Sequence, residues 1–304
     1  MLLLVLTGCK YPFDLDQKDA EPMAAIKSYL CADSLVTIDI CKTVPLSQLA
    51  TADSILKNPH FSLRCNGADV EVSESVMGGR MILRADAFKA GDMIELVFGS
   101  DDMETALAET VIPEKFPEYG LELGKSEIAA RNLKIRYDDD PDTDDWYGAV
   151  VKWRGIQVAD VGLDEYQYTE VSDQDIIPPT GYNDIQIEPE SYSPIVLNFD
   201  GYYLYIWKDT DEEDNEYDLH FNYKAYWDGS VMDVKDAEIQ CTLFTLSEEM
   251  YRHLFAEFDY LSNPFMGAGL SSPAFTYTNV RNGVGYLCGY STIQSEWIKD
   301  TLFE

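Results

Sequence analysis

Apolar and polar residues alternate along most of the chain, and a period of two is typical of β-strands that bury one face. Val36, Ile38 and Ile40 alternate with polar residues, and segment 219–227 repeats this pattern most clearly. Comparable runs occur at 70–72, 94–98, 133–137, 149–153, 194–208, 274–280 and 284–291. The pattern therefore predicts a mainly β protein.

Turn residues separate these runs and indicate two domains. Asn66-Gly67 stands between short strands, and strands at this spacing are typical of an Ig-like or fibronectin-like β-sandwich, which we expect over 23–118. The later strands predict a second antiparallel β domain over 119–304. Within it, segment 157–193 shows no regular period, so we expect a long loop, either functional or partly structured.

One segment, near 247–262, has helical spacing instead. Ser247 can cap its first turn, and the glutamates that follow suit the positive end of a helix dipole. Pro264 ends the run. Its apolar residues are Met250, Tyr251, Leu254, Phe255, Phe258 and Leu261. We expect this amphipathic helix to pack its apolar face on the second sheet and not to bind a partner.

The first residues indicate a membrane anchor. An apolar run at 2–6 precedes Thr7-Gly8-Cys9 and is too short to span a bilayer. The order Leu-Thr-Gly-Cys resembles a bacterial lipobox, in which the cysteine is acylated, although no Lys or Arg precedes the run. We therefore interpret 1–8 as a signal remnant, Cys9 as the lipidated residue and 9–22 as an acidic tether.

The charge of the chain restricts its partners. Against 22 basic residues stand 55 acidic ones, a net charge of −33 at pH 7, which repels nucleic acid and anionic lipid. The hydrophobic fraction of 46% is enough for a real core. We expect no nucleic-acid partner and a membrane contact through the lipid alone.

Five cysteines remain beside the lipidated one. They are Cys31, Cys41, Cys65, Cys241 and Cys288. No pair has the Cys-x-x-Cys spacing of a metal or redox motif. Cys241 and Cys288 both lie in strand-like runs, so a disulfide between them and two separate buried thiols both stay open.

The acidic segment 138–145 is a candidate cation site. Asp138, Asp140 and Asp142 place carboxylates at alternating positions, which suits a hard cation such as calcium. The segment lacks the glycine and the distant glutamate of an EF-hand loop, and a solvated loop is the alternative. A second acidic run, 209–216, lies between two strands and is interpreted as a hairpin tip. We expect no cofactor, with calcium at this segment as the alternative.

Catalytic motifs are missing from the sequence. Its three histidines, His60, His220 and His253, show no metal-ligand spacing, and no Gly-x-Ser-x-Gly elbow occurs. We expect His253 at the surface of the helix. A glycosidase that uses two carboxylates stays open, but nothing favours it. The expected class is a protein without enzymatic activity.

Tyrosines gather in the middle of the second domain. Tyr166, Tyr168 and Tyr182 fall on the expected long loop, where exposed rings beside carboxylates suit the capture of a peptide or glycan. Ordinary sheet packing is the alternative, and it is the interpretation we favour for the tyrosines at 202–205.

Several motifs resemble a known family. They are 246–252 (Leu-Ser-Glu-Glu-Met-Tyr-Arg), 263–265 (Asn-Pro-Phe), 282–291 (Asn-Gly-Val-Gly-Tyr-Leu-Cys-Gly-Tyr-Ser), 90–96 and 110–113. Together they resemble the Bacteroidota lipoprotein family called domain of unknown function 4249. Tyr286-Leu287-Cys288 departs from that family's usual Ile-Phe-Gly.

The resemblance implies an outer-membrane lipoprotein, often encoded beside a TonB-dependent transporter, with no established enzymatic activity. From it we expect a lipid-anchored binding or accessory protein that faces the cell exterior and works with such a transporter in peptide or glycan capture. The alternative is a structural or adhesive surface lipoprotein without a transporter partner.

Overall fold

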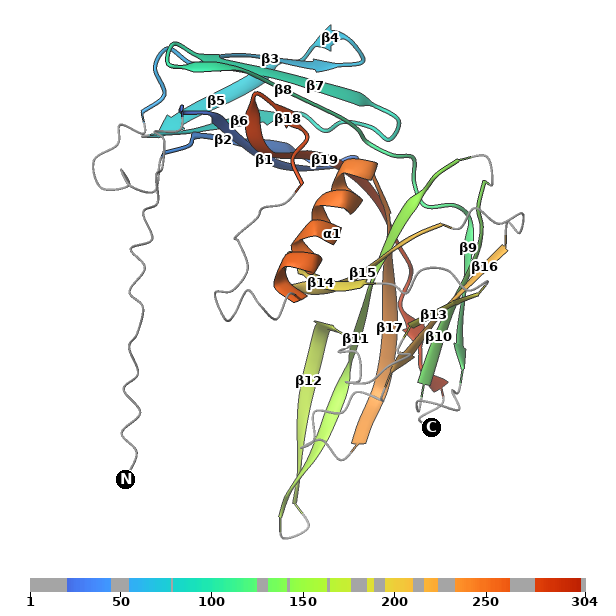
Figure 1. Cartoon of the computed structure of the whole chain (residues 1–304). Coiled ribbons are helices and arrows are strands. Elements are labelled where there is room, and N and C mark those ends of the chain that lie inside the picture. Colours follow the sequence, from blue (N-terminus) through green and yellow to red (C-terminus); the bar gives the residue numbers. More distant parts are fainter. Residues whose placement is uncertain are drawn as a thin grey trace, which may run out of the picture.

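The computed structural model describes residues 21–44, 55–77, 79–124, 131–140, 143–162, 165–175, 185–188, 195–209, 216–223, 233–262 and 277–301. Within these ranges the chain forms three β-sheets and one α-helix (Figure 1). The signal remnant, Cys9, most of the tether, Asp142, Tyr182 and Pro264 lie outside the described residues.

The largest of the three sheets has 11 strands, which come from both the N-terminal and the C-terminal part of the described chain. Its strands follow the order β14 (Ile195–Phe199), β15 (Tyr202–Lys208), β11 (Trp146–Gly162), β17 (Asp233–Leu246), β19 (Gly283–Gln294), β1 (Ala24–Cys31), β2 (Val36–Lys42), β6 (Arg80–Ala85) and β5 (Val72–Met77). Two further strands, β12 (Glu165–Asp175) and β20 (Ile298–Lys299), pair with β11 and β17.

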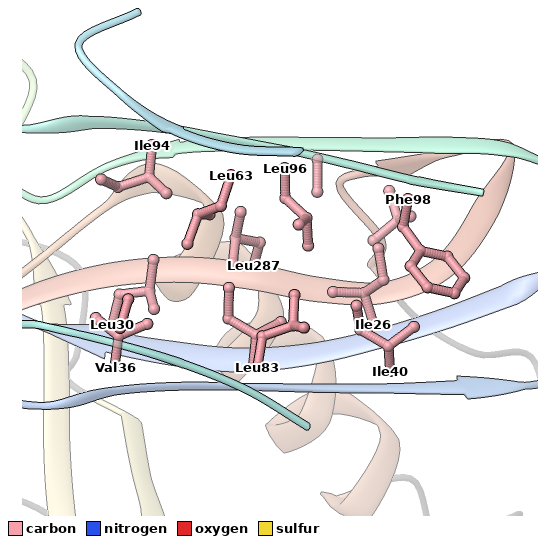
Figure 2. Close-up of a cluster of buried hydrophobic side chains, with 14 of the residues drawn as sticks. Ile26, Leu30, Val36, Ile40, Leu63, Leu83, Ile94, Leu96, Phe98 and Leu287 are labelled. Atoms are coloured by element: carbon pink, nitrogen blue, oxygen red, sulfur yellow. The ribbon is translucent and has the colours of Figure 1, made fainter. Parts of the chain in front are cut away.

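A five-stranded sheet covers one half of this large sheet. Its order is β18 (Val280–Arg281), β8 (Met103–Val111), β7 (Met93–Ser100), β3 (His60–Cys65) and β4 (Ala68–Asp69). Side chains from the two layers, such as Ile26 and Leu83 on one and Leu96 on the other, meet in a buried core (Figure 2). Asn66 and Gly67 both have positive φ at the β3–β4 turn, as the hairpin signal predicts.

A four-stranded sheet covers the other half. Its order is β13 (Ile185–Glu188), β16 (Glu216–Tyr223), β10 (Arg131–Asp138) and β9 (Tyr119–Gly124). Leu133, Ile135 and Leu219 from this layer pack against Trp153 and Leu243 from β11 and β17. The predicted fold class, mainly β with a sandwich, a second antiparallel part and one helix, is confirmed.

Strand β19 joins the two halves. It pairs in parallel with β1 from Ala24↔Gly283 to Cys31↔Tyr290, and antiparallel with β17. Leu287 on β19 lies in the same core as Ile26 and Leu96. The boundary predicted between 118 and 119 stays a prediction, but the first sandwich contains a strand from the far end of the chain.

Helix α1 (Glu248–Ser262) confirms the helix predicted near 247–262. Ser247 caps it, because its Oγ accepts a hydrogen bond from the Met250 amide at 3.1 Å. Met250 and Leu254 pack in a core with β15 and β17. Phe255 and Leu261, predicted on the same buried face, are exposed, so the apolar face is only partly covered.

Segment 157–193 is partly structured over the described residues, which is the second of the two alternatives expected for it, and it is not one long loop. Strand β11 continues to Gly162, and β12 returns beside it as a long twisted hairpin with two register shifts. Bulges of this kind break the regular alternation that identifies a strand in the sequence. Most of the acidic run predicted as a hairpin tip, 210–215, lies outside the described residues, and the strands on either side of it, β15 and β16, belong to different sheets.

The cysteines in the described residues are all free thiols. The register pairs Leu246 of β17 with Tyr290 of β19, so Cys241 and Cys288 lie several rungs apart along neighbouring strands. They also belong to different cores, on opposite faces of the sheet. The disulfide alternative is therefore wrong, and both residues act as core packing.

Candidate functional site

A cavity of about 860 Å³ lies under helix α1, and we call it the aromatic cavity. Strands β1 and β19 form its floor, α1 forms its roof, and the β14–β15 turn closes one end. Five of its fourteen lining residues are tyrosine or phenylalanine. Its volume falls in the range typical of small-molecule sites.

Strand alternation puts the floor residues on one face of the sheet. Lys27 and Tyr29 of β1 lie in register with Tyr286 and Cys288 of β19 and face α1. The residues between them in sequence, such as Ile26, face the opposite core. The floor is therefore a sheet region buried on one face and open to a cavity on the other.

The rings in the aromatic cavity contact one another. Tyr29 and Tyr286 lie 4.7 Å apart between centroids, and Phe199 meets the Tyr29 ring edge-on at 5.2 Å. The Tyr29 hydroxyl is also hydrogen-bonded to that of Tyr286, and burial is the main cause that raises the pKa of Tyr29. These rings offer a preorganised apolar surface with polar tips.

His253 of helix α1 lines the cavity, which corrects the prediction that it lies at the helix surface. It is buried, and its ring stacks on Tyr286 with centroids 4.0 Å apart. Burial, and then the nearby Lys27, lower its pKa to about 4, so the imidazole is neutral at pH 7. Its Nδ1 has no hydrogen-bond partner among the described residues.

Three charged residues line the aromatic cavity: Lys27, Asp200 and Glu257. Asp39, which lies beside Lys27 across the β1–β2 pair, is already bound to Arg80 by two hydrogen bonds of 2.5 and 2.6 Å.

The three charged residues that line the cavity, Lys27, Asp200 and Glu257, make no ion pair within the described ranges. The cavity therefore presents one cation and two carboxylates that a ligand can contact.

Backbone geometry shapes both ends of the floor. Asp200 and Gly201 have φ of 50° and 86°, which makes the tight turn that brings Asp200 to the cavity. Gly285 has φ of 102°, and a Cβ there would lie 1.9 Å from the Ile26 carbonyl oxygen. Only glycine allows β19 to approach β1 this closely.

Of the three tyrosines predicted as ligand contacts, Tyr182 lies outside the described residues. Tyr166 and Tyr168 belong to strand β12 and not to a loop. The Tyr168 ring is exposed, and the Lys235 ammonium lies 5.3 Å from its centroid. Tyr168 is not a lining residue of the aromatic cavity, and a ligand role for these tyrosines stays a prediction.

The acidic segment borders a smaller cavity of about 390 Å³, lined by Asp138, Asp139, Asp140 and Asp145 together with Tyr147. The Tyr147 hydroxyl donates to Asp139 at 2.5 Å. Burial, with Asp145 and Asp140 nearby, raises the pKa of Asp139. Among the described residues, no group of three or more acidic, histidine or cysteine side chains is placed so that it could hold a metal ion. Calcium binding at Asp138 and Asp140 stays a prediction.

Comparisons with known proteins give little information about function. No family model and no curated protein matches the chain. Among solved structures it is similar to a tandem segment of titin (9% identity, TM-score 0.21, 88% of this chain and 62% of that one). It is also similar to the adhesin InvE of Yersinia pseudotuberculosis (11%, 0.20, 74% and 55%) and to the major pilin subunit of Bacillus cereus (10%, 0.22, 92% and 69%). TM-scores this low carry no argument about function.

Sequence reasoning missed the aromatic cavity, although one signal was present. His253 and Glu257 fall three and seven positions after Met250, on the stripe of the helix that also carries Leu254 and Leu261. Polar residues on an otherwise apolar stripe indicate a cavity or a buried polar contact. The floor gave no such signal, because its two strands come from opposite ends of the sequence.

Proposed function

We propose that this protein is a lipid-anchored, outward-facing outer-membrane binding protein that captures a small peptide or glycan in the aromatic cavity. The observation that carries the proposal is the cavity itself, which combines aromatic rings in mutual contact with three charged groups that make no ion pair within the described ranges. Binding needs no bond rearrangement, so the role is docking and delivery.

The anchor and the delivery partner belong to the same proposal. Acylation of Cys9 would hold the chain at the outer membrane, and the tether at 9–22 would let it reach a neighbour. The motifs at 246–252 and 282–291 support a TonB-dependent transporter as that neighbour. Among the described residues, no helix is both long and apolar enough to cross a bilayer.

Blocking the cavity tests the binding function. Val284 lines the floor, so Val284→Trp fills the cavity with an aromatic ring that a strand accepts. Val76→Trp is the matched control, since Val76 is an exposed strand residue outside the cavity. We expect calorimetry with panels of tripeptides and trisaccharides to detect binding by the parent and by Val76→Trp, and none by Val284→Trp.

The absence of binding from both panels would contradict the capture function. Equal binding by Val284→Trp would place the ligand elsewhere on the molecule.

Recovery of the tagged protein from native outer membranes in mild detergent tests the partner. We expect mass spectrometry to find a TonB-dependent transporter in stoichiometric amount, and Cys9→Ser to remove the protein from the membrane fraction. Recovery of the lipoprotein alone, with other membrane complexes intact, would support the structural or adhesive alternative instead.

A further inference from the structure

We infer that the ligand of the aromatic cavity is a short peptide with free termini, bound with its carboxylate toward Lys27 and its ammonium toward Asp200. This inference rests on the function proposed above and specifies its ligand class. The evidence is the position of the charged residues along the cavity floor.

The floor has two distinguishable ends. Lys27 is in register with Tyr286, and four rungs further along the pair Tyr290 lies beside the Asp200 turn. At 3.3 Å per residue, four rungs span about 13 Å. An extended chain of three to four residues covers about the same distance, since each residue spans about 3.3–3.6 Å. A tripeptide fits between the cation and the carboxylate.

The charged residues that line the cavity favour a zwitterionic peptide over a neutral sugar as the ligand. Taking a lysine and two carboxylates partly out of water costs free energy unless the ligand supplies opposite charges. A zwitterionic peptide supplies both at once, with a charge-assisted hydrogen bond at each end. Glu257, on the roof near Tyr29 and Tyr286, adds a carboxylate that suits a backbone N–H or a basic side chain. A neutral trisaccharide leaves all of these charges unpaired.

The middle of the cavity suits the body of a peptide. Tyr29, Phe199 and Tyr286 form an apolar surface for one large side chain. The His253 ring, which is buried and neutral at pH 7, stacks on Tyr286 and extends this surface.

The test uses the full chain in detergent and the tripeptide Ala-Phe-Ala with free termini, its C-terminal amide, its N-acetyl form and maltotriose. We expect the free tripeptide to bind and each blocked form to bind about tenfold more weakly, as the loss of one charge-assisted contact predicts. In Lys27→Met, the free peptide and the amide should bind equally. In Asp200→Asn, which keeps a residue that tolerates positive φ, the free and acetylated forms should bind equally.

Lys89→Met is the matched control, because Lys89 is exposed and lies outside the cavity. It should keep the tenfold preference for the free carboxylate. Binding of maltotriose without the peptides would overturn this inference and leave the capture function intact. Equal affinity for free and blocked peptides would also overturn it. If neither peptides nor maltotriose bind, both proposals fail.

Discussion

At the scale of single residues, Asp209 at the end of β15 is buried close to other aspartates, which disfavours its charged form. Asp209 is 5% exposed, and its Oδ1 has no hydrogen-bond partner among the described residues. Burial raises its pKa to about 6 and the charge of Asp139 adds to the shift, while a hydrogen bond from the Asp145 backbone opposes it. Since an unfolded aspartate titrates near 3.9, folding favours the protonated form.

We therefore predict that Asp209→Asn stabilises the protein at neutral pH. The stability that Asp209 contributes is greatest below about pH 4 and is lost as pH rises through about 6, because the charged form is the one that burial disfavours. The amide removes that charge, and we expect a gain of about 1–2 kcal/mol at pH 7.5 and little change at pH 4. Urea unfolding at the two pH values measures the difference.

Asp86→Asn serves as the control, because Asp86 is exposed and its substitution should change stability equally little at both pH values. An equal gain for Asp209→Asn at pH 4 and pH 7.5, or a loss at pH 7.5, would contradict the assigned cause.

A second single-residue effect concerns Gly285, where the structure leaves no room for a side chain. We predict that Gly285→Ala costs about 3 kcal/mol or more, because the new Cβ meets the Ile26 carbonyl and the positive φ is strained for alanine. Thermal unfolding measures it. Gly120→Ala is the matched control, since a Cβ at Gly120 meets no atom within 4 Å, and its change should stay within about 1 kcal/mol. Similar effects at both positions would show that the close approach of β1 and β19 is unimportant.

At the scale of elements, one hydroxyl ties helix α1 to the cavity floor. Ser247 Oγ accepts from the Met250 amide and, at 3.2 Å, from the Gly289 amide of β19. The Ser247 amide in turn donates to the Gly289 carbonyl at 2.9 Å. The Ser247 cap therefore fixes both the start of helix α1 and the position of α1 relative to strand β19.

We predict that Ser247→Ala destabilises the protein by about 1–2 kcal/mol, since two buried amides lose their acceptor. Ser247→Thr keeps the hydroxyl and should cost less. Hydrogen exchange should locate the loss in the first turn of α1 and at Gly289. An unchanged exchange rate at Gly289 would contradict the link between the cap and the strand.

At the scale of the whole molecule, the first sandwich depends on the last strands. Leu287 lies in the same core as Ile26 and Phe98 (Figure 2). Strand β19, which carries Leu287, is also the parallel neighbour of β1. A fragment that ends at 118 leaves one side of β1 unpaired and exposes part of that core.

We predict that fragment 23–118 does not unfold cooperatively on its own. Joining segment 277–295 to it through a flexible linker should restore a cooperative transition, because the linker replaces only the connection and the pairing partner returns. Circular dichroism during heating measures both. Cooperative unfolding of 23–118 alone would support a domain boundary at 118.

The sequence by itself determined what depends on neighbouring residues. The alternation at 36–40, the Asn66-Gly67 turn and the Ser247 cap each specify a strand, a hairpin or a helix start, because their backbone hydrogen bonds and burial are decided within a few positions. The mainly β class followed from these local patterns.

Only the tertiary structure decided the pairing of β1 with β19, the core packed on one face of that pair and the aromatic cavity on the other. Those features join segments from opposite ends of the chain, and many strands could satisfy the same alternation. The choice among them depends on the fit of side chains across the sheet, as at Gly285 and Ile26, and not on a local pattern.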